Sequence, residues 1–185
     1  MTLYKDKYRI QSTRLQGYDY SSDGAYFVTI CVKNGECIFG EIKNGIMGLN
    51  RLGCVVNNFW LETLNNYKNV QLDDYIIMPN HFHGIIIINN SYVEIIHELS
   101  LRGRFDIKKR RKMLIPKIIG RFKMQSAKQI NITKNTKGEC VWQKNYYDRI
   151  IRNESELSRI CDYIRFNPGK WEYDRNNPTN LKNPK

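Results

Sequence analysis

Two histidines stand one residue apart in the stretch His81-Phe82-His83, shortly before four consecutive isoleucines at 85–88. The run of β-branched residues predicts a strand over 81–88 that is buried on both faces. Side chains alternate across a strand, so His81 and His83 project from one face while Phe82 projects from the other. This geometry can present two imidazole nitrogens to one metal ion, although two structural histidines would fit the same spacing.

A tyrosine and an asparagine near the C-terminus form the second candidate group. Asn153 as a cap, with Glu156 three residues later, predicts a helix over about 154–167. Tyr163 and Asn167 lie one turn apart on this helix, beside its apolar stripe. A tyrosine hydroxyl is a competent nucleophile towards phosphorus when a cation neutralises the phosphate, and an amide oxygen could complete the ligands of that cation. The alternative is a half-buried tyrosine that packs on the sheet and an asparagine that ends the helix before the following proline.

The chain is strongly basic, and the excess charge is concentrated in one segment. It has 30 Lys/Arg against 18 Asp/Glu, a formal net charge of +12, and residues 101–150 hold 15 basic but three acidic residues. Such a segment is typical of surfaces that neutralise nucleic-acid phosphates. The alternatives to nucleic-acid binding are a solvated basic loop and a surface attracted to anionic lipid. Seven of the basic residues fall within 102–112, and three more follow on one face of a predicted helix. The predicted DNA contacts are Arg102, Arg104, Lys108, Lys109, Arg110, Arg111, Lys112, Lys117, Arg121 and Lys128.

Hydrophobic patterning predicts the elements that must hold these groups. Strands and helices alternate along the chain, which indicates an α+β fold built on a sheet with helices packed on one face. The predicted strands are 25–32, 70–78, 81–88 and short strands within 36–48, and the predicted helices are 49–66, a basic helix after residue 114, and 154–167.

Length and composition predict a single domain. The 185 residues are expected to form one domain over 1–173, with a basic insertion at about 101–112 and a flexible tail over 174–185. No apolar run approaches the ~20 residues of a membrane-spanning helix. The charged N-terminus lacks the features of a secretory signal, so the protein is expected in the cytoplasm. The five cysteines are scattered and form no Cys-x-x-Cys pair, which argues against a disulfide framework and a zinc ribbon.

Five separated segments share their pattern and order with a known family. They are residues 17–20 (GYDY), 24–30 (GAYFVTI), 75–85 (YIIMPNHFHGI), 142–148 (WQKNYYD), and 162–168, where Asp-Tyr-Ile is followed by Asn-Pro. Together they resemble REP-associated tyrosine transposases, within the single-tyrosine HUH transposase superfamily. The similarity extends from about residue 9 to residue 171.

The resemblance implies a ferredoxin-like antiparallel sheet with helices on one face, the histidines on a central strand and the nucleophile on a C-terminal helix. It implies that His81, His83 and Asn167 bind Mg²⁺ or Mn²⁺, and that Tyr163 is the nucleophile. The implied reaction cleaves and rejoins single-stranded DNA at hairpin-forming palindromic repeats through a 5′-phosphotyrosine. Tyr146 and Tyr147 match a family segment that leads into the nucleophile's helix, and we interpret them as structural or DNA-contacting.

Two other functions remain open at the level of sequence. A domesticated DNA-binding protein would use the basic segment but would need neither a metal nor Tyr163. A metal-dependent nuclease that activates water would form no covalent adduct and would tolerate Tyr163→Phe. The sequence is compatible with a monomer and with a homodimer.

Overall fold

The computed structural model describes residues 15, 17–90 and 113–181. The predicted DNA contacts between Arg102 and Lys112 therefore lie outside the described residues. Within the described part, no helix is both long enough and apolar enough to cross a membrane.

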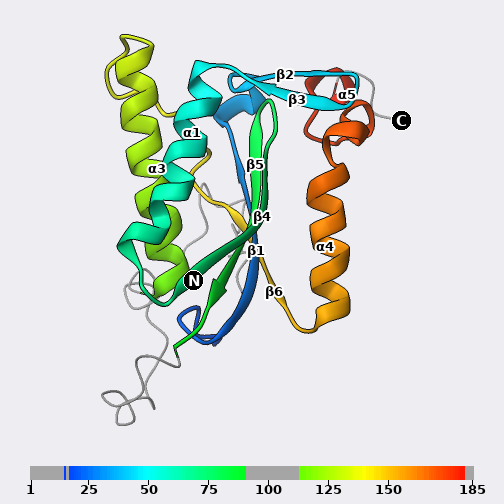
Figure 1. The fold of residues 1–185 in the computed structure, drawn as a ribbon. Helices are drawn as coiled ribbons and strands as arrows, with labels where there is room; N and C mark the ends of the chain where they lie inside the picture. Colours follow the sequence, from blue (N-terminus) through cyan, green and yellow to red (C-terminus); the bar gives the residue numbers. More distant parts are fainter. Residues whose placement is uncertain (1–14, 16, 91–112, 182–185) are drawn as a thin grey trace, which may run out of the picture.

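A four-stranded sheet forms the centre of the molecule (Figure 1). Its strand order is β4-β5-β1-β6, and every neighbouring pair is antiparallel. Two helices, α1 and α3, connect the strands in the order β-α-β-β-α-β, the ferredoxin-like arrangement. The predicted α+β class and antiparallel sheet are confirmed. The strands are β1 (Gly24–Cys31), β4 (Val70–Ile77), β5 (His81–Ile88) and β6 (Tyr147–Ile151).

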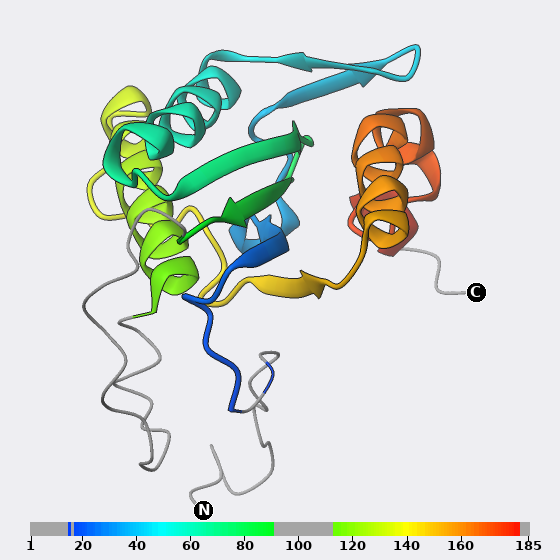
Figure 2. The same cartoon turned by 60° about the horizontal axis from the view of Figure 1, so that its bottom comes forward.

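One face of the sheet packs against α1 (Arg51–Leu61) and α3 (Leu114–Thr133), which lie side by side in Figures 1 and 2. Trp60 of α1 stands over Phe82 of β5, with ring centroids 4.4 Å apart. A Cβ atom on Gly84 would lie 2.8 Å from the Trp60 ring, so close packing excludes a side chain at that position. Phe82 and Gly84 therefore face α1, so His81 and His83, which alternate with them along β5, face the other side of the sheet.

The opposite face packs against α4 (Glu154–Phe166) (Figure 2). Ile85 of β5 contacts Cys161 and Ile164 of this helix. Because side chains alternate, this is also the face from which His81 and His83 project. The family resemblance implied helices on one face of the sheet, and these correspond to α1 and α3. The helix that carries Tyr163, α4, covers the other face, from which the histidines project.

The N-terminus of α4 is capped as predicted. The Asn153 side chain accepts a hydrogen bond from the Glu156 amide at 2.8 Å. The Glu156 carboxylate also accepts from the Arg152 amide and from the Arg149 side chain of β6. Because of these bonds the pKa of Glu156 lies below its ordinary value. The capping group therefore joins α4 to the edge strand β6, which the sequence analysis did not predict.

The remaining predicted elements are confirmed in part. The helix predicted over 49–66 consists of α1 and a 3-10 turn, η2 (Glu62–Asn66). The Asn44-Gly45 turn joins β2 (Gly40–Lys43) to β3 (Ile46–Leu49), and both turn residues have positive φ, as a two-residue hairpin requires. Asn34-Gly35 lies in a short 3-10 helix, η1 (Lys33–Gly35).

The prediction of a flexible tail from residue 174 differs from the structure over 174–181. After α4 the chain forms η3 (Pro168–Tyr173) and α5 (Pro178–Leu181). The carbonyl of Asn176 accepts a hydrogen bond from the Asn80 side chain at 2.7 Å, which holds this segment against the sheet. Its asparagines suggested a loop by composition, yet the side chains of Asp174 and Asn177 accept hydrogen bonds from the backbone amides of Asn176 and Thr179 in successive turns. Residues 182–185 lie outside the described residues.

Candidate active site

His81 and His83 lie at the start of the central strand β5 and are almost fully buried. Their exposed fractions are 0% and 3%, and their ring centroids are 4.6 Å apart. Their partners across the β1 pairing are Cys31 and Thr29. The structure therefore brings the two histidines to one place, as the period-two pattern predicted.

Hydrogen bonds to Asn80 fix which nitrogen of His81 carries the proton. The Asn80 Nδ2 donates to the carbonyls of Gly35 and Asn176, at 2.8 and 2.7 Å. The Oδ1 atom of the same amide is therefore the group that faces His81 Nδ1, at 2.9 Å. Since an amide oxygen only accepts, His81 Nδ1 is protonated and its Nε2 has the lone pair. Among the described residues, His81 Nε2 has no hydrogen-bond partner.

His83 lies between a threonine and the candidate nucleophile. Its Nδ1 is 2.8 Å from the hydroxyl of Thr29, and its Nε2 is 3.3 Å from the hydroxyl of Tyr163. When Nδ1 donates to Thr29, Nε2 has the lone pair, as in His81. A second group that orients the far nitrogen is the usual arrangement of metal-binding histidines.

Tyr163 reaches the histidines from α4. Its ring packs against His83 and Phe27, with centroid distances of 5.2 and 6.0 Å, while 44% of the residue stays exposed. Partial burial raises the pKa of Tyr163 above its ordinary value, and the Asn167 side chain opposes this rise. The phenol therefore needs a nearby positive charge before it can act as a phenolate at neutral pH.

Asn167 lies one turn after Tyr163 and is 3% exposed. It keeps helical dihedrals although a proline follows, because η3 continues the chain in a helical turn. Its buried Oδ1 has no hydrogen-bond partner among the described residues. An orphaned amide oxygen is costly when buried and suits a cation ligand.

Asp174 and Arg175, which follow η3, also lie close to the site, and sequence reasoning did not identify them. Asp174 Oδ2 is 3.9 Å from His81 Nε2, and the positive charge of Arg175 lowers the pKa of His81, His83 and Tyr163. A pocket of about 390 Å³ opens on this side of β1. It is lined by Thr29, Cys31, Gln143, Tyr147, Arg175 and Asn176. Composition assigned Asp174 and Arg175 to a tail, so their sequence positions gave no signal.

The donor atoms of the site fit a divalent cation. Burial lowers the pKa of His81 to about 4 and that of His83 well below its ordinary value, with Arg175 contributing to both shifts. Both imidazoles are therefore neutral at pH 7, the form that binds metal. The lone pair of His81 and the Oδ1 of Asn167 have no other partner in the described part of the chain. Two nitrogens and an amide oxygen suit Mn²⁺, and the oxygen ligands also suit Mg²⁺.

The chain has a relative of known sequence and solved structures of similar fold. It is 42% identical over 166 residues to an uncharacterized protein of Haemophilus influenzae, which covers 89% of this chain and 91% of the relative. The chain belongs to the same family as that protein. No family model matches the present chain.

The structure of the REP-associated tyrosine transposase bound to a REP hairpin has a similar fold. The superposition covers 88% of this chain and 76% of the transposase chain, with a TM-score of 0.52 and 17% sequence identity. The chain has the fold of this tyrosine transposase. A candidate transposase from Deinococcus radiodurans covers 82% of this chain and 95% of its own, but its TM-score of 0.46 at 13% identity is too low for further comparison.

This fold separates the basic face of α3 from the candidate active site. Lys117, Arg121 and Lys128 are exposed on α3, whose buried side chains face the sheet. Tyr163, on α4, and the histidines lie on the opposite face of that sheet. Figure 2 shows α4 on this side of the sheet, away from α3. The structure thus brings together the four predicted catalytic and metal residues, but not the three described DNA contacts.

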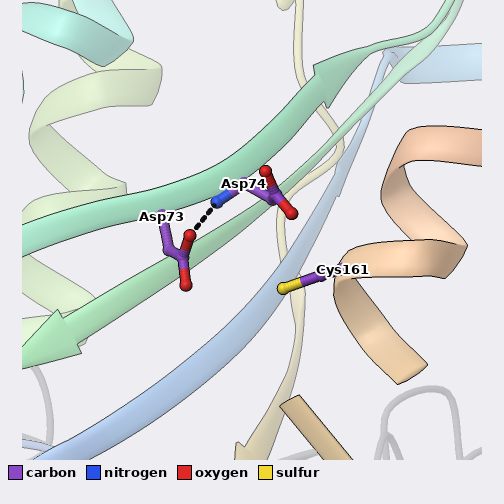
Figure 3. Close-up of side chains that lie close together, drawn as sticks. All are labelled: Asp73, Asp74 and Cys161. Carbon is purple, nitrogen blue, oxygen red and sulfur yellow. Dashed lines mark hydrogen bonds between the residues drawn. The ribbon is translucent and has the colours of Figure 1, made fainter. Parts of the chain in front are cut away.

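A second group of possible ligands lies between β4 and α4. Figure 3 shows Asp73 and Asp74 from the strand beside Cys161 from the helix. Their possible ligand atoms all lie within 4.8 Å of one another. Arg165 already neutralises Asp74 through an ion pair at 2.8 Å. Burial, together with the two carboxylates, raises the pKa of Cys161 to about 11, so the thiol stays protonated. This group therefore braces α4 against the sheet edge.

The buried histidines predict a loss of stability in acid. The pKa of His81 is about 4 in the folded chain against 6.5 for an ordinary histidine. Below pH 6.5 the His81 imidazole binds a proton in the unfolded chain but stays neutral in the folded chain. The free energy of unfolding therefore falls as the pH is lowered from 6.5 to about 4. Each pKa unit is worth about 1.4 kcal/mol.

Urea unfolding of the metal-free protein at pH 7.5, 6 and 5 measures this loss. His81→Gln removes the titrating group, and its stability should depend less on pH over the same interval. Equal slopes for the two proteins would contradict the prediction.

Proposed function

We propose that the chain is a metal-dependent, single-tyrosine transposase that cleaves and rejoins single-stranded DNA at hairpin-forming repeats. The observation that supports this most directly is the approach of the Tyr163 hydroxyl to His83 Nε2, at 3.3 Å, beside the second histidine of the same strand. Nucleophile and metal ligands come from one chain, so the proposed site needs no second copy. The hairpin named with the transposase of the same fold supports a hairpin substrate.

The proposed reaction is a transesterification at phosphorus. The Tyr163 oxygen forms a bond to the phosphorus, and the bond from phosphorus to the 3′ oxygen breaks. The product is a 5′-phosphotyrosine and a free 3′-hydroxyl, and attack by another 3′-hydroxyl reverses the step and rejoins the strand. The phenol proton leaves to water, because 44% of Tyr163 is exposed. The departing 3′ oxygen takes up a proton.

Several residues assist Tyr163 in this proposal. His81, His83 and Asn167 would hold Mg²⁺ or Mn²⁺, which when bound supplies positive charge at the phosphate and favours the phenolate. Asn167 also lowers the pKa of Tyr163. Arg175, which lines the pocket together with Thr29, would add a positive charge for the phosphate backbone. The exposed ring of Tyr147 in the same pocket is suited to stacking on an unpaired base.

A covalent-adduct assay tests the proposed function. The protein is incubated with a single-stranded DNA hairpin and Mn²⁺ or Mg²⁺, and a denaturing gel separates free protein from protein bound to DNA. A 3′-end label should move with the protein, and a 5′-labelled fragment should be released. EDTA should abolish both products. Cleavage without an adduct would indicate hydrolysis by water, and binding without cleavage would indicate a DNA-binding protein.

The basic face of α3 is proposed to hold DNA away from the reacting phosphate. The triple variant Lys117→Gln, Arg121→Gln, Lys128→Gln should weaken hairpin binding by roughly tenfold, and the dependence of affinity on salt should become less steep by up to about 0.9 per lost phosphate contact. Fluorescence anisotropy at several salt concentrations measures both quantities.

A matched variant controls for net charge in this experiment. Lys43→Gln, Arg51→Gln, Lys68→Gln removes the same three charges from exposed positions outside α3. It should retain most of the affinity. Equal losses in the two triple variants would show that α3 acts only through net charge.

A further inference from the structure

Asp174 places a carboxylate next to His81 although it lies outside the predicted ligand set. Its Oδ1 accepts a hydrogen bond from the Asn176 amide at 2.6 Å, which forms a turn after η3. Its Oδ2 points towards His81 and lies 3.9 Å from Nε2. The Asp174 side chain is 9% exposed, and that of His81 is 0% exposed.

The contact between these two atoms is unfavourable without a positive charge. A separation of 3.9 Å is too long for a hydrogen bond. The Asn80 amide holds the proton of His81 on Nδ1, so Nε2 turns a lone pair towards the carboxylate oxygen. Two electron-rich atoms therefore face each other where little water can screen them.

A cation between the two atoms would remove this conflict. Metal bonds of about 2.0–2.2 Å to nitrogen and oxygen place two ligand atoms between about 3 and 4.3 Å apart, depending on the angle at the metal. The 3.9 Å between His81 Nε2 and Asp174 Oδ2 lies within this interval. We propose that the Asp174 carboxylate is a further ligand of the divalent cation at His81 and His83.

This inference rests on the metal centre of the proposed function and changes its chemistry. Two imidazoles and the Asn167 amide are neutral ligands, whereas Asp174 contributes a negative charge and the hard oxygen that Mg²⁺ and Mn²⁺ prefer. Asn80 positions both parts of the site, because its Oδ1 faces His81 and its Nδ2 binds the carbonyl of Asn176. The segment after α4 is thereby part of the metal centre.

Calorimetric titration of the metal-free protein with MnCl₂ tests the role of Asp174. Asp174→Asn keeps an oxygen that can accept from the Asn176 amide and removes the charge, so the turn should persist. We expect its Mn²⁺ affinity to fall at least tenfold. The matched control Glu172→Gln removes a charge from an exposed residue of η3 and should bind Mn²⁺ as the wild type does.

Thermal unfolding provides a second readout that needs no catalysis. In EDTA, Asp174→Asn should unfold at or somewhat above the wild-type temperature, because the unfavourable contact with His81 Nε2 is relieved. Mn²⁺ should raise that temperature less than in the wild type. Wild-type affinity and stabilisation in Asp174→Asn would overturn the assignment of Asp174 alone. No Mn²⁺ binding by the wild type, or undiminished binding by His81→Ala, would instead overturn the metal centre on which the inference rests.

Discussion

Tyr163→Phe is expected to abolish the covalent adduct between protein and DNA, reducing its rate of formation by at least roughly 10³-fold. The substitution removes the oxygen that would bond to phosphorus and leaves the ring in place. The hydroxyl contacts His83 Nε2 at 3.3 Å and is partly exposed, so its loss should change the stability of the fold little. Adduct formation on a denaturing gel, hairpin affinity by anisotropy and the unfolding temperature together measure the outcome.

Tyr173→Phe is the matched control for this variant. Tyr173 ends η3 and is 86% exposed, so it offers a hydroxyl close in sequence to the site segment but outside the histidine contacts. It should form the adduct at the wild-type rate. An adduct that survives in Tyr163→Phe would show that another residue is the nucleophile, and cleavage that survives without an adduct would favour the hydrolytic nuclease.

The positions of the site residues within their own elements were predictable from sequence. The alternation of a strand places His81 and His83 on one face, and the helical repeat places Tyr163 and Asn167 one turn apart. Both rules are local and depend on spacing alone. The face of the sheet on which α4 lies is a tertiary result, because it depends on the packing of Ile85 and Ile151 against Cys161 and Ile164.

Strand β6 and the position of Asp174 could not be predicted from local sequence patterns. In β6, Asp148 and Arg149 interrupt the apolar pattern, and the strand exists because it pairs with β1 from Ala25 to Thr29. Asp174 stands in an Asn-rich stretch typical of a loop, and it reaches His81 only because Asn80, far away in sequence, binds the Asn176 carbonyl. Long-range hydrogen bonds of this kind produce no periodic pattern in the amino-acid sequence.

The charge pattern predicted that the basic side chains of α3 share an exposed face, but it did not predict where that face lies in the fold. The basic residues of α3 fall on one face, as their spacing predicted, and the structure leaves Lys117, Arg121 and Lys128 exposed. Their place across the sheet from Tyr163 depends on the connection order of the fold. Under the proposed function, a DNA hairpin held by α3 would therefore have to extend around the sheet edge to reach Tyr163.

Asn80→Ala is expected to weaken both the fold and metal binding, because one buried amide positions several parts of the site. Asn80 is 2% exposed, donates to the carbonyls of Gly35 and Asn176, and accepts from His81. Leaving buried partners unsatisfied costs about 1–3 kcal/mol each, so we expect the free energy of unfolding to fall by roughly 2–4 kcal/mol. The loss of the group that orients His81 should reduce Mn²⁺ affinity by roughly 10–100-fold.

Comparison with Asn80→Asp separates the two roles of this side chain. An aspartate retains an oxygen that can accept from His81 Nδ1 but has no hydrogen to donate to Gly35 or Asn176. Its Mn²⁺ affinity should therefore exceed that of Asn80→Ala in calorimetric titration, whereas urea unfolding should show a loss of stability in both. Equal Mn²⁺ affinities in the two variants would mean that His81 keeps its orientation without Asn80, and the lone pair on Nε2 would then need another explanation.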